Sequence, residues 1–317
     1  MPYFWVNVAQ TNKGANQMEH AQSGIFDDNN RHSYFLEYVI TNRDAETINV
    51  LKNALKNISD NLNCSSVIAF GRRLWQHLDN QAEALDFTDF ATLSGPFGHT
   101  APATQHDLLI WLHGDDLDGV FDAMQLCQSQ LNGVAILALE CPGFRYKDNR
   151  DLTGFVDGSA NPKDLAAKAE AALLPTSHSH QQGSFVLTQK WVHDLSEFEK
   201  LPVTVQEKIV GRTKPDSIEL EGDDMPKNSH VSRTDVKVDN VAMKLYRRSV
   251  PFGNANEKGL YFLGFACEQQ RFQIQLERMF GLTQDGIYDK LIDYSKAVNS
   301  AYWFAPSQTQ LTQIVTT

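Results

Sequence analysis

The sequence predicts an α+β protein built from two ferredoxin-like halves with antiparallel sheets and peripheral helices. One observation is the order strand, helix, strand, strand, helix, strand between residues 35 and 140. A second is the return of this order after residue 183, beyond a stretch rich in Gly, Asp and Pro at 142–162. A third is the length of 317 residues, which is typical of about two domains. We therefore expect an N-terminal half at 1–145 and a C-terminal half at 146–317.

The N-terminal half alternates segments of strand and helix character. Residues 44–62 carry apolar side chains at spacings of three and four, which is typical of a helix with one buried face. Residues 107–114 (DLLIWLHG) are almost entirely apolar, which predicts a central strand. The other expected elements are strands at 35–42, 65–71 and 134–140 and a helix at 116–131.

The C-terminal half repeats the pattern without obvious residue identity. The polar segment 177–183 is interpreted as an exposed loop, because its His178 and His180 are more typical of a solvated turn than of a metal site. The expected elements are strands at 183–194, 241–248 and 259–268 and helices at 196–212 (broken near Pro202), 271–280 and 287–299.

Charge and composition exclude several classes of protein. The 28 Lys and Arg against 39 Asp and Glu give a net charge of −11, which argues against nucleic acid or an anionic membrane as the main partner. No apolar run approaches the roughly 20 residues that span a bilayer, and the first residues lack the pattern of a secretory signal. The four cysteines are scattered without a CxxC pair, so we expect buried, reduced thiols in a cytoplasmic protein.

The stretch GFVDGSANP at 154–162 is the most informative candidate for chemistry. Gly154 and Gly158 bracket Asp157, and Asn161 stands near the end of the turn. Glycine permits positive φ and close approach of the backbone to a flat ligand, so Asp157 could be a positioned proton acceptor. The same residues also suit an ordinary Asx-type turn, and the local pattern leaves both readings open.

A histidine and two arginines follow in separate motifs. His230 lies in MPKNSHVSR; a lone histidine is usually a satisfied polar residue, yet imidazole is also a frequent metal and haem ligand. Arg247 and Arg248 stand in YRRSVPFG at the end of an expected strand. Because adjacent strand residues point to opposite faces, we expect one arginine in a buried pocket and the other in solvent.

The order of these motifs resembles the dye-decolourising peroxidases. GFVDGSANP, NSHV and LYRRSVPFG follow one another along the chain. GRTKPDSIE at 211–219 lies between the first two, and YDKLIDYSKAVNSAYWFAPS follows the arginines. The resemblance extends from PATQHDLLIWLHG at 102–114 to FAPS, and is strongest to the cytoplasmic B-type (P-type) branch, which lacks long insertions.

The resemblance implies a duplicated ferredoxin-like fold of the dimeric α+β barrel type that holds one haem b per chain in the C-terminal half. His230 would be the proximal iron ligand, backed by Asp289, with Asp293 as second choice. The residues expected on the distal side are Asp157, Gly158, Asn161, Arg247 and Ser249.

The implied activity is that of a haem-dependent peroxidase that reduces hydrogen peroxide and oxidises dyes, phenolics or other one-electron donors. Asp157 would move a proton, and Arg247 would stabilise negative charge and lower the pKa of Asp157. Electrons would pass at the haem edge or through surface residues such as Tyr246, Tyr302 or Trp303.

Partners and an alternative follow from the same resemblance. We expect a homo-oligomer, a dimer or larger, while the C-terminal SQTQLTQIVTT lacks the pattern of encapsulin cargo. The alternative function is a haem-binding or haem-processing (porphyrinogen-handling) protein with incidental peroxidase activity.

Overall fold

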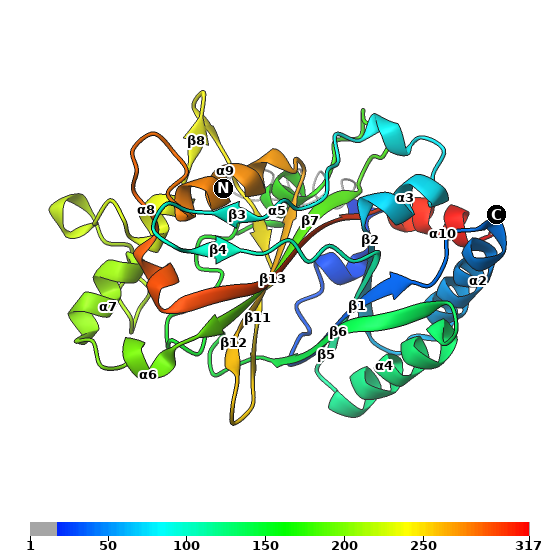
Figure 1. The fold of residues 1–317 in the computed structure, drawn as a ribbon, viewed down its shortest axis with the longest axis horizontal. Coiled ribbons are helices and arrows are strands. Elements are labelled where there is room, and N and C mark those ends of the chain that lie inside the picture. Colours follow the sequence, from blue (N-terminus) through cyan, green and yellow to red (C-terminus); the bar gives the residue numbers. More distant parts are fainter. Residues whose placement is uncertain (1–17, 317) are drawn as a thin grey trace, which may run out of the picture.

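A nine-stranded antiparallel sheet organises residues 18–316, which the computed structural model describes (Figure 1). Its strand order is β10-β12-β7-β13-β2-β5-β1-β6, and β11 also pairs with β12. The strands are β1 (His32–Ile40), β2 (Ser65–Phe70), β5 (Leu108–Gly114), β6 (Ala135–Phe144), β7 (Ser184–His193), β10 (Tyr246–Arg247), β11 (Val250–Gly253), β12 (Lys258–Ala266) and β13 (Ser295–Ala305).

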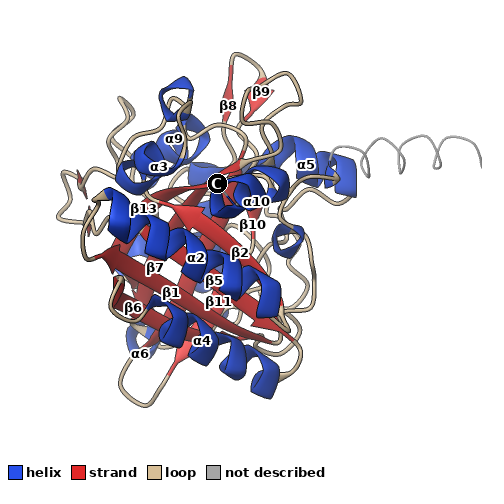
Figure 2. Cartoon of the chain, turned by 90° about the vertical axis from the view of Figure 1, so that its right-hand side faces the viewer, coloured by secondary structure: helices blue, strands red, loops and turns tan. Residues whose placement is uncertain are grey.

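The first half-sheet has the order β2-β5-β1-β6, and helices α2 (Ala45–Asn61) and α4 (Leu117–Leu131) lie across one of its faces (Figure 2). Asp44 caps α2 by accepting from Thr47 N at 2.8 Å, and Asp116 caps α4 in the same way. The stripe predicted on the first helix is buried, as a helix that covers a sheet requires.

The second half-sheet, β10-β12-β7-β13, has the same topology. In each half the first strand lies between the third and fourth, and a helix precedes the fourth strand; here that helix is α9 (Gln270–Met279). The expected break near Pro202 is confirmed, because α6 (Leu195–Phe198) ends before it and α7 (Val203–Val210) begins after it. The predicted fold class, a duplicated ferredoxin-like α+β fold, is confirmed.

The two half-sheets meet along two seams and enclose a common interior. At one seam β13 pairs with β2 through Phe304 and Phe70. At the other β11 lies against β6, where a Cβ on Gly143 would stand 2.8 Å from Val250 Cγ1. The C-terminal half-sheet therefore has one face toward the shared interior and another toward its own helices, α9 and the short α8 (His230–Thr234).

The expected helix at 287–299 is wrong. The chain forms only a 3-10 turn at Lys290–Asp293 and then enters β13, which pairs with β7 along almost its whole length. The alanines and spaced apolar residues of this segment suit a helix locally, but the chain pairs with β7 instead, and residues 299–305 are buried on both faces of the strand. The expected strand at 241–248 is also shorter, since only β9 (Val241–Ala242) and β10 form.

Several connecting elements were not predicted. The loop at 177–183 is not wholly exposed, because His180 is buried with its Nε2 at 2.6 Å from Asp79 Oδ2.

Within residues 18–316 no helix is long and apolar enough to cross a membrane, and the first residues lie outside the described part. The remaining elements are α3 (Arg72–Leu78), α5 (Leu165–Ala172), α10 (Gln308–Thr316), β3 (Leu93–Ser94), β4 (Thr100–Ala101) and β8 (Lys237–Val238).

Gly259 tests how closely β12 approaches β7. A Cβ at this position would lie 1.8 Å from Trp191 O, so Gly259→Ala must push the two strands apart. We expect a loss of about 1–3 kcal/mol of unfolding free energy, measured by chemical denaturation. The control is Gly119→Ala in α4, where the new Cβ meets only the Asp116 side chain. Equal stability of the two variants would contradict this packing.

Candidate active site

A cavity of about 380 Å³ lies on the helix-covered face of the C-terminal half-sheet. Its volume falls in the range of about 300–1,000 Å³ that is usual for ligand pockets. One wall is made by alternate residues of β7: Leu187, Gln189, Trp191 and His193. Because every second side chain of a strand points to the same face, these four side chains form a continuous row along the cavity.

His230 begins α8 and lines the cavity. Its Nδ1 lies 2.6 Å from Asp289 Oδ2, and the other oxygen of this fully buried carboxylate accepts from Leu291 N at 2.9 Å. Asp293 instead pairs with His99, 2.9 Å away, and with Lys290. Of the two aspartates expected behind the imidazole, Asp289 is the one in contact, and it leaves Nε2 as the ring nitrogen available to a ligand.

The helix that carries His230 is fixed from its other side by two arginines. Arg233, 1% exposed, donates to Asp285 Oδ2 at 2.7 Å and to the Arg278 carbonyl at 3.0 Å. Arg278 in turn donates to the carbonyls of Arg233 and Ser232, at 3.1 and 2.9 Å. These bonds satisfy the C-terminal carbonyls of a five-residue helix and restrict the position of the imidazole.

The loop that carries Asp157 is locked onto β10. Asn161 Nδ2 donates to the Arg247 carbonyl at 2.8 Å, and the Arg247 N–H donates to Asn161 Oδ1 at 2.9 Å. Gly154 and Gly158 have φ of +91° and +70°, which favours glycine, and Gly158 N–H donates to Asp157 Oδ1 at 2.7 Å. Asp157, Gly158 and Arg247 line the cavity, while the Asn161 amide stands behind them as their brace.

Burial raises the pKa of Asp157 above its ordinary 3.8. The Arg247 guanidinium, the Gly158 N–H and His230 lower it, while the negative charge of Asp151 adds to the rise. Arg247 therefore lowers the pKa of Asp157, as expected, but the pKa that results from all contributions together is raised and not lowered. Desolvation outweighs attraction because the protein encloses the carboxylate around the cavity wall.

At the arginine motif, the expectation that one arginine faces solvent is wrong, and Ser249 is not found among the residues that line the cavity. Arg248 does not face solvent; it is buried, donates to the Ile25 carbonyl at 2.7 Å and lies 5.1 Å over the Trp111 ring. Ser249 does not line the cavity, and its buried hydroxyl has no hydrogen-bond partner within the described residues. The aromatic residues expected at the surface are all buried: Tyr246, Tyr302 and Trp303.

A polar chain on the cavity wall was missed in the sequence. His193 Nε2 lies 3.0 Å from Asp151 Oδ1, and His193 Nδ1 lies 2.7 Å from Ser295 Oγ. Burial opposes ionisation of Asp151, but the charge of His193 and hydrogen bonds from His193 and Thr153 lower its pKa. The alternation along β7 could have identified His193; nothing local in the sequence identifies Asp151 or Ser295 as its partners.

The donors and walls of the cavity fit an iron porphyrin. One imidazole has its second nitrogen free, and the apolar walls suit a flat, largely hydrophobic ring. Arg212 and Lys244 also line the cavity as cations, and they pair there with Glu219 and Asp235. Across residues 18–316 no group of three or more His, Cys, Asp or Glu side chains is placed to hold a metal ion.

Comparison with known proteins gives one family. The family model described as "Dyp-type peroxidase, N-terminal" matches residues 22–145, and the model described as "Dyp-type peroxidase, C-terminal" matches residues 148–310. A dye-decolorizing peroxidase of Mycolicibacterium paratuberculosis is 34% identical over 77% of this chain and 69% of its own length.

Solved structures agree. A Dyp-type peroxidase protein from Shewanella oneidensis superimposes with a TM-score of 0.86 at 29% identity, covering 93% of this chain and 98% of that chain. A variant of DypB from Rhodococcus jostii RHA1 in complex with heme superimposes with a TM-score of 0.83 at 31% identity, covering 90% and 96%.

Replacement of Arg247 tests the balance of charge at Asp157. Because the guanidinium lowers this pKa, Arg247→Met should raise it further, as followed by the carboxyl stretch in infrared spectra of the protein without cofactor. Asp157→Asn identifies the band. The matched control is Arg212→Met, since Arg212 also lines the cavity but pairs with Glu219. An unchanged pKa in Arg247→Met would refute the coupling.

Proposed function

The chain belongs to the Dyp-type peroxidase family, and from that premise we propose that its cavity binds one haem b through His230. The protein is a haem-dependent dye-decolorizing peroxidase. The observation that carries the residue assignment is that His230, Asp157 and Arg247 all line one largely apolar cavity. When bound, the haem supplies the iron at which hydrogen peroxide is reduced and one-electron donors are oxidised.

His230 offers Nε2 to the iron, since Nδ1 is engaged by Asp289. The Nδ1–H donates to this carboxylate, which fixes the tautomer and makes the imidazole a more electron-rich ligand. The bonds of Arg233 and Arg278 to the backbone of α8 hold the ring in place for this role.

Asp157 accepts a proton from the peroxide oxygen and returns it to the departing one. A positioned proton carrier of this kind contributes roughly 10²- to 10⁴-fold in rate. Arg247 remains cationic at any working pH, and stabilises the negative charge that grows on the peroxide oxygen. Asn161 relates the two side chains, because it bonds to the backbone of Arg247 and lies in the same turn as Asp157.

Two further residues complete the distal side of the proposal. Gly158 provides a close approach of the backbone to the ring, since it lines the cavity without a side chain. Ser249 is assigned to hold a water beside Arg247, because its buried hydroxyl has no hydrogen-bond partner within residues 18–316.

The finer classification is also proposed. Assignment to the B-type (P-type) branch is supported by mutual coverage of 90% and 96% with the Rhodococcus jostii structure, which leaves little room for long insertions. A cytoplasmic location is supported by four free cysteines. A homo-oligomer is supported by the outer side of β6, the last strand in the order, where Ile136 is 62% exposed. We also propose that the chain divides into halves at 1–145 and 146–317, and that the haem lies in the C-terminal half.

His230→Ala should abolish the Soret band of the purified protein, because His193, the other imidazole that the described residues bring to the cavity, has both ring nitrogens engaged. The control is His77→Ala, an exposed histidine on α3. An intact Soret band in His230→Ala would remove this residue as the ligand. Wild-type turnover of peroxide and a dye no faster than free haem would favour the haem-processing alternative.

The reaction with peroxide should slow at acidic pH. Asp157 acts as a carboxylate, so its function is lost as the pH falls through its pKa, which burial places above 3.8. Stopped-flow rates of the Soret change should show this acidic limb, and Asp157→Asn should be slower and lose it. An identical limb in Asp157→Asn would assign the titration to another group.

A further inference from the structure

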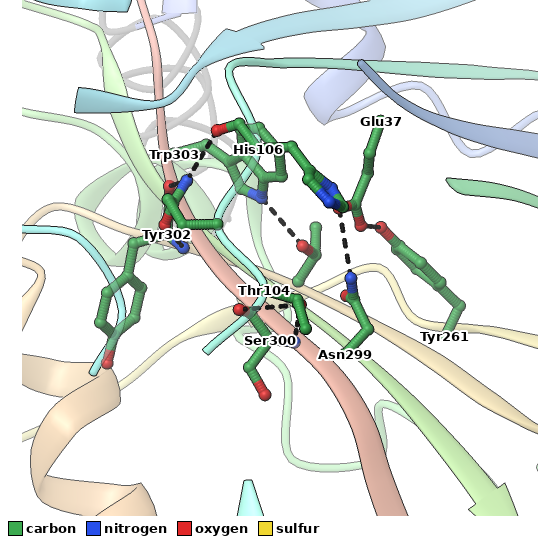
Figure 3. A network of polar contacts seen from close by, with 10 residues as sticks. Glu37, Thr104, His106, Tyr261, Asn299, Ser300, Tyr302 and Trp303 are labelled. Carbon is green, nitrogen blue, oxygen red and sulfur yellow. Dashed lines mark hydrogen bonds and ion pairs between the residues drawn. The ribbon is translucent and has the colours of Figure 1, made fainter. Parts of the chain in front are cut away.

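A second polar cluster lies outside the cavity, around the buried carboxylate of Glu37 (Figure 3). Tyr261 OH donates to Glu37 Oε1 at 2.6 Å. His106 Nδ1 lies 2.7 Å from Oε2, and Asn299 Nδ2 donates to the same oxygen at 3.3 Å. Glu37 is 0% exposed, and these contacts come from both halves of the chain. The phenol O–H points at a carboxylate oxygen at hydrogen-bond distance, so a proton that leaves the phenol has an acceptor directly beside it.

Tyr261 is separated from the cavity only by the thickness of one strand. Its neighbours on β12, Leu260 and Phe262, both line the cavity. Since successive side chains of a strand point to opposite faces, Tyr261 enters the shared interior of the two half-sheets. The phenol therefore lies behind the cavity wall and is shielded from bulky reductants.

The rings around Tyr261 make it the easiest to oxidise in its stack. Phe35 stacks on it with ring centroids 3.9 Å apart, and Trp111 lies parallel to Phe35 at 6.1 Å. Phenylalanine is much harder to oxidise than tyrosine. The Arg248 guanidinium, 5.1 Å from the Trp111 ring, opposes the removal of an electron from that indole. A missing electron would thus reside on Tyr261 rather than move along the stack.

The other buried aromatic candidates lack a carboxylate acceptor. Tyr302 OH lies 3.3 Å from the amide oxygen of Gln273, and Trp303 Nε1 donates to Thr188 Oγ1 at 2.8 Å. Tyr246 stacks on Phe26 and has cations near its ring. An amide or hydroxyl oxygen is a far weaker base than a carboxylate, so Tyr302 and Trp303 would retain their protons, and the cations beside Tyr246 oppose the removal of an electron from its ring.

We propose that Tyr261 and Glu37 form an internal one-electron redox site, which holds an oxidising equivalent when peroxide has been reduced and no external donor is bound. The phenol gives one electron to the haem oxidised by peroxide; its O–H bond breaks, and the proton binds Glu37 Oε1. The products are a neutral phenoxyl radical and a neutral carboxylic acid, and the haem has lost one oxidising equivalent. This inference rests on the proposed function.

Proton transfer is required because of burial. The interior raises the pKa of Tyr261 far above its ordinary value, so the phenol keeps its proton before oxidation. An oxidised phenol that retained the proton would be a cation in an apolar core, which is strongly unfavourable. The His106 side chain is 19% exposed, so it connects the second oxygen of Glu37 to solvent. Return of an electron and the proton restores the starting state.

The test is freeze-quench electron paramagnetic resonance of the haem-loaded protein after peroxide is added without a reductant. Wild type and Tyr302→Phe should give a tyrosyl radical, and Tyr261→Phe should lose it. Tyr302→Phe is a matched control, since both phenols are buried and only Tyr261 donates to a carboxylate. Glu37→Gln keeps the shape but removes the base, and should reduce the radical yield to about a tenth or less.

The outcomes are distinguishable. An unchanged radical in Tyr261→Phe overturns the proposal, and a full yield in Glu37→Gln overturns the role of the carboxylate. A Soret band that peroxide leaves unchanged in wild type overturns the proposed function and this inference with it. A measurement without haem checks the variants: the phenol C–O stretch of Tyr261, assigned with Tyr261→Phe, should shift in Glu37→Gln. Absence of that shift would contradict the hydrogen bond on which the proposal depends.

Discussion

The hydrogen bond between His230 and Asp289 is the contact on which the cavity depends. Asp289 is fully buried, so the bond satisfies a carboxylate that would otherwise be costly to enclose. The backbone N–H of Asp289 donates to the Met279 carbonyl, and the next residue, Lys290, donates to Asn228. One short segment therefore ties α8, the end of α9 and the approach to β13 together. The free imidazole nitrogen is a consequence of this assembly and not of the helix alone.

The strands of the C-terminal half-sheet serve two polar sites from opposite faces. On β12, Leu260 and Phe262 face the cavity while Tyr261 faces Glu37. On β7, Gln189 faces the cavity and Thr188 faces the interior, where it accepts from Trp303. The duplication supplies the second layer that this arrangement needs, because a lone half-sheet would leave its inner face in water. The interior is thus part of the chemistry available to the cavity and more than a packing core.

Two opposing effects determine the pKa of Asp157 in the distal loop. Arg247 favours the ionised form of Asp157, as its sign requires, but enclosure by the protein favours the neutral form more strongly. Asn161 reduces the freedom of both groups by bonding to the backbone of one and standing four residues after the other. The resulting site combines a guanidinium with a carboxylate whose pKa is raised above its ordinary value.

The sequence by itself predicted most of the order of elements and the helix stripes, because these depend on local periodicity. It also drew attention to His230, Asp157 and Arg247 through motifs whose order resembles one family, and the structure brings these three residues to one cavity. It did not determine β13, since a segment with alanines becomes a strand only when β7 offers a long register of hydrogen bonds. Nor did it determine the burial of Arg248 or the choice of Asp289 over Asp293. Those outcomes, like the meeting of Glu37 with Tyr261, join residues far apart in the chain. Only the closure of two half-sheets around one interior brings such pairs within hydrogen-bond distance.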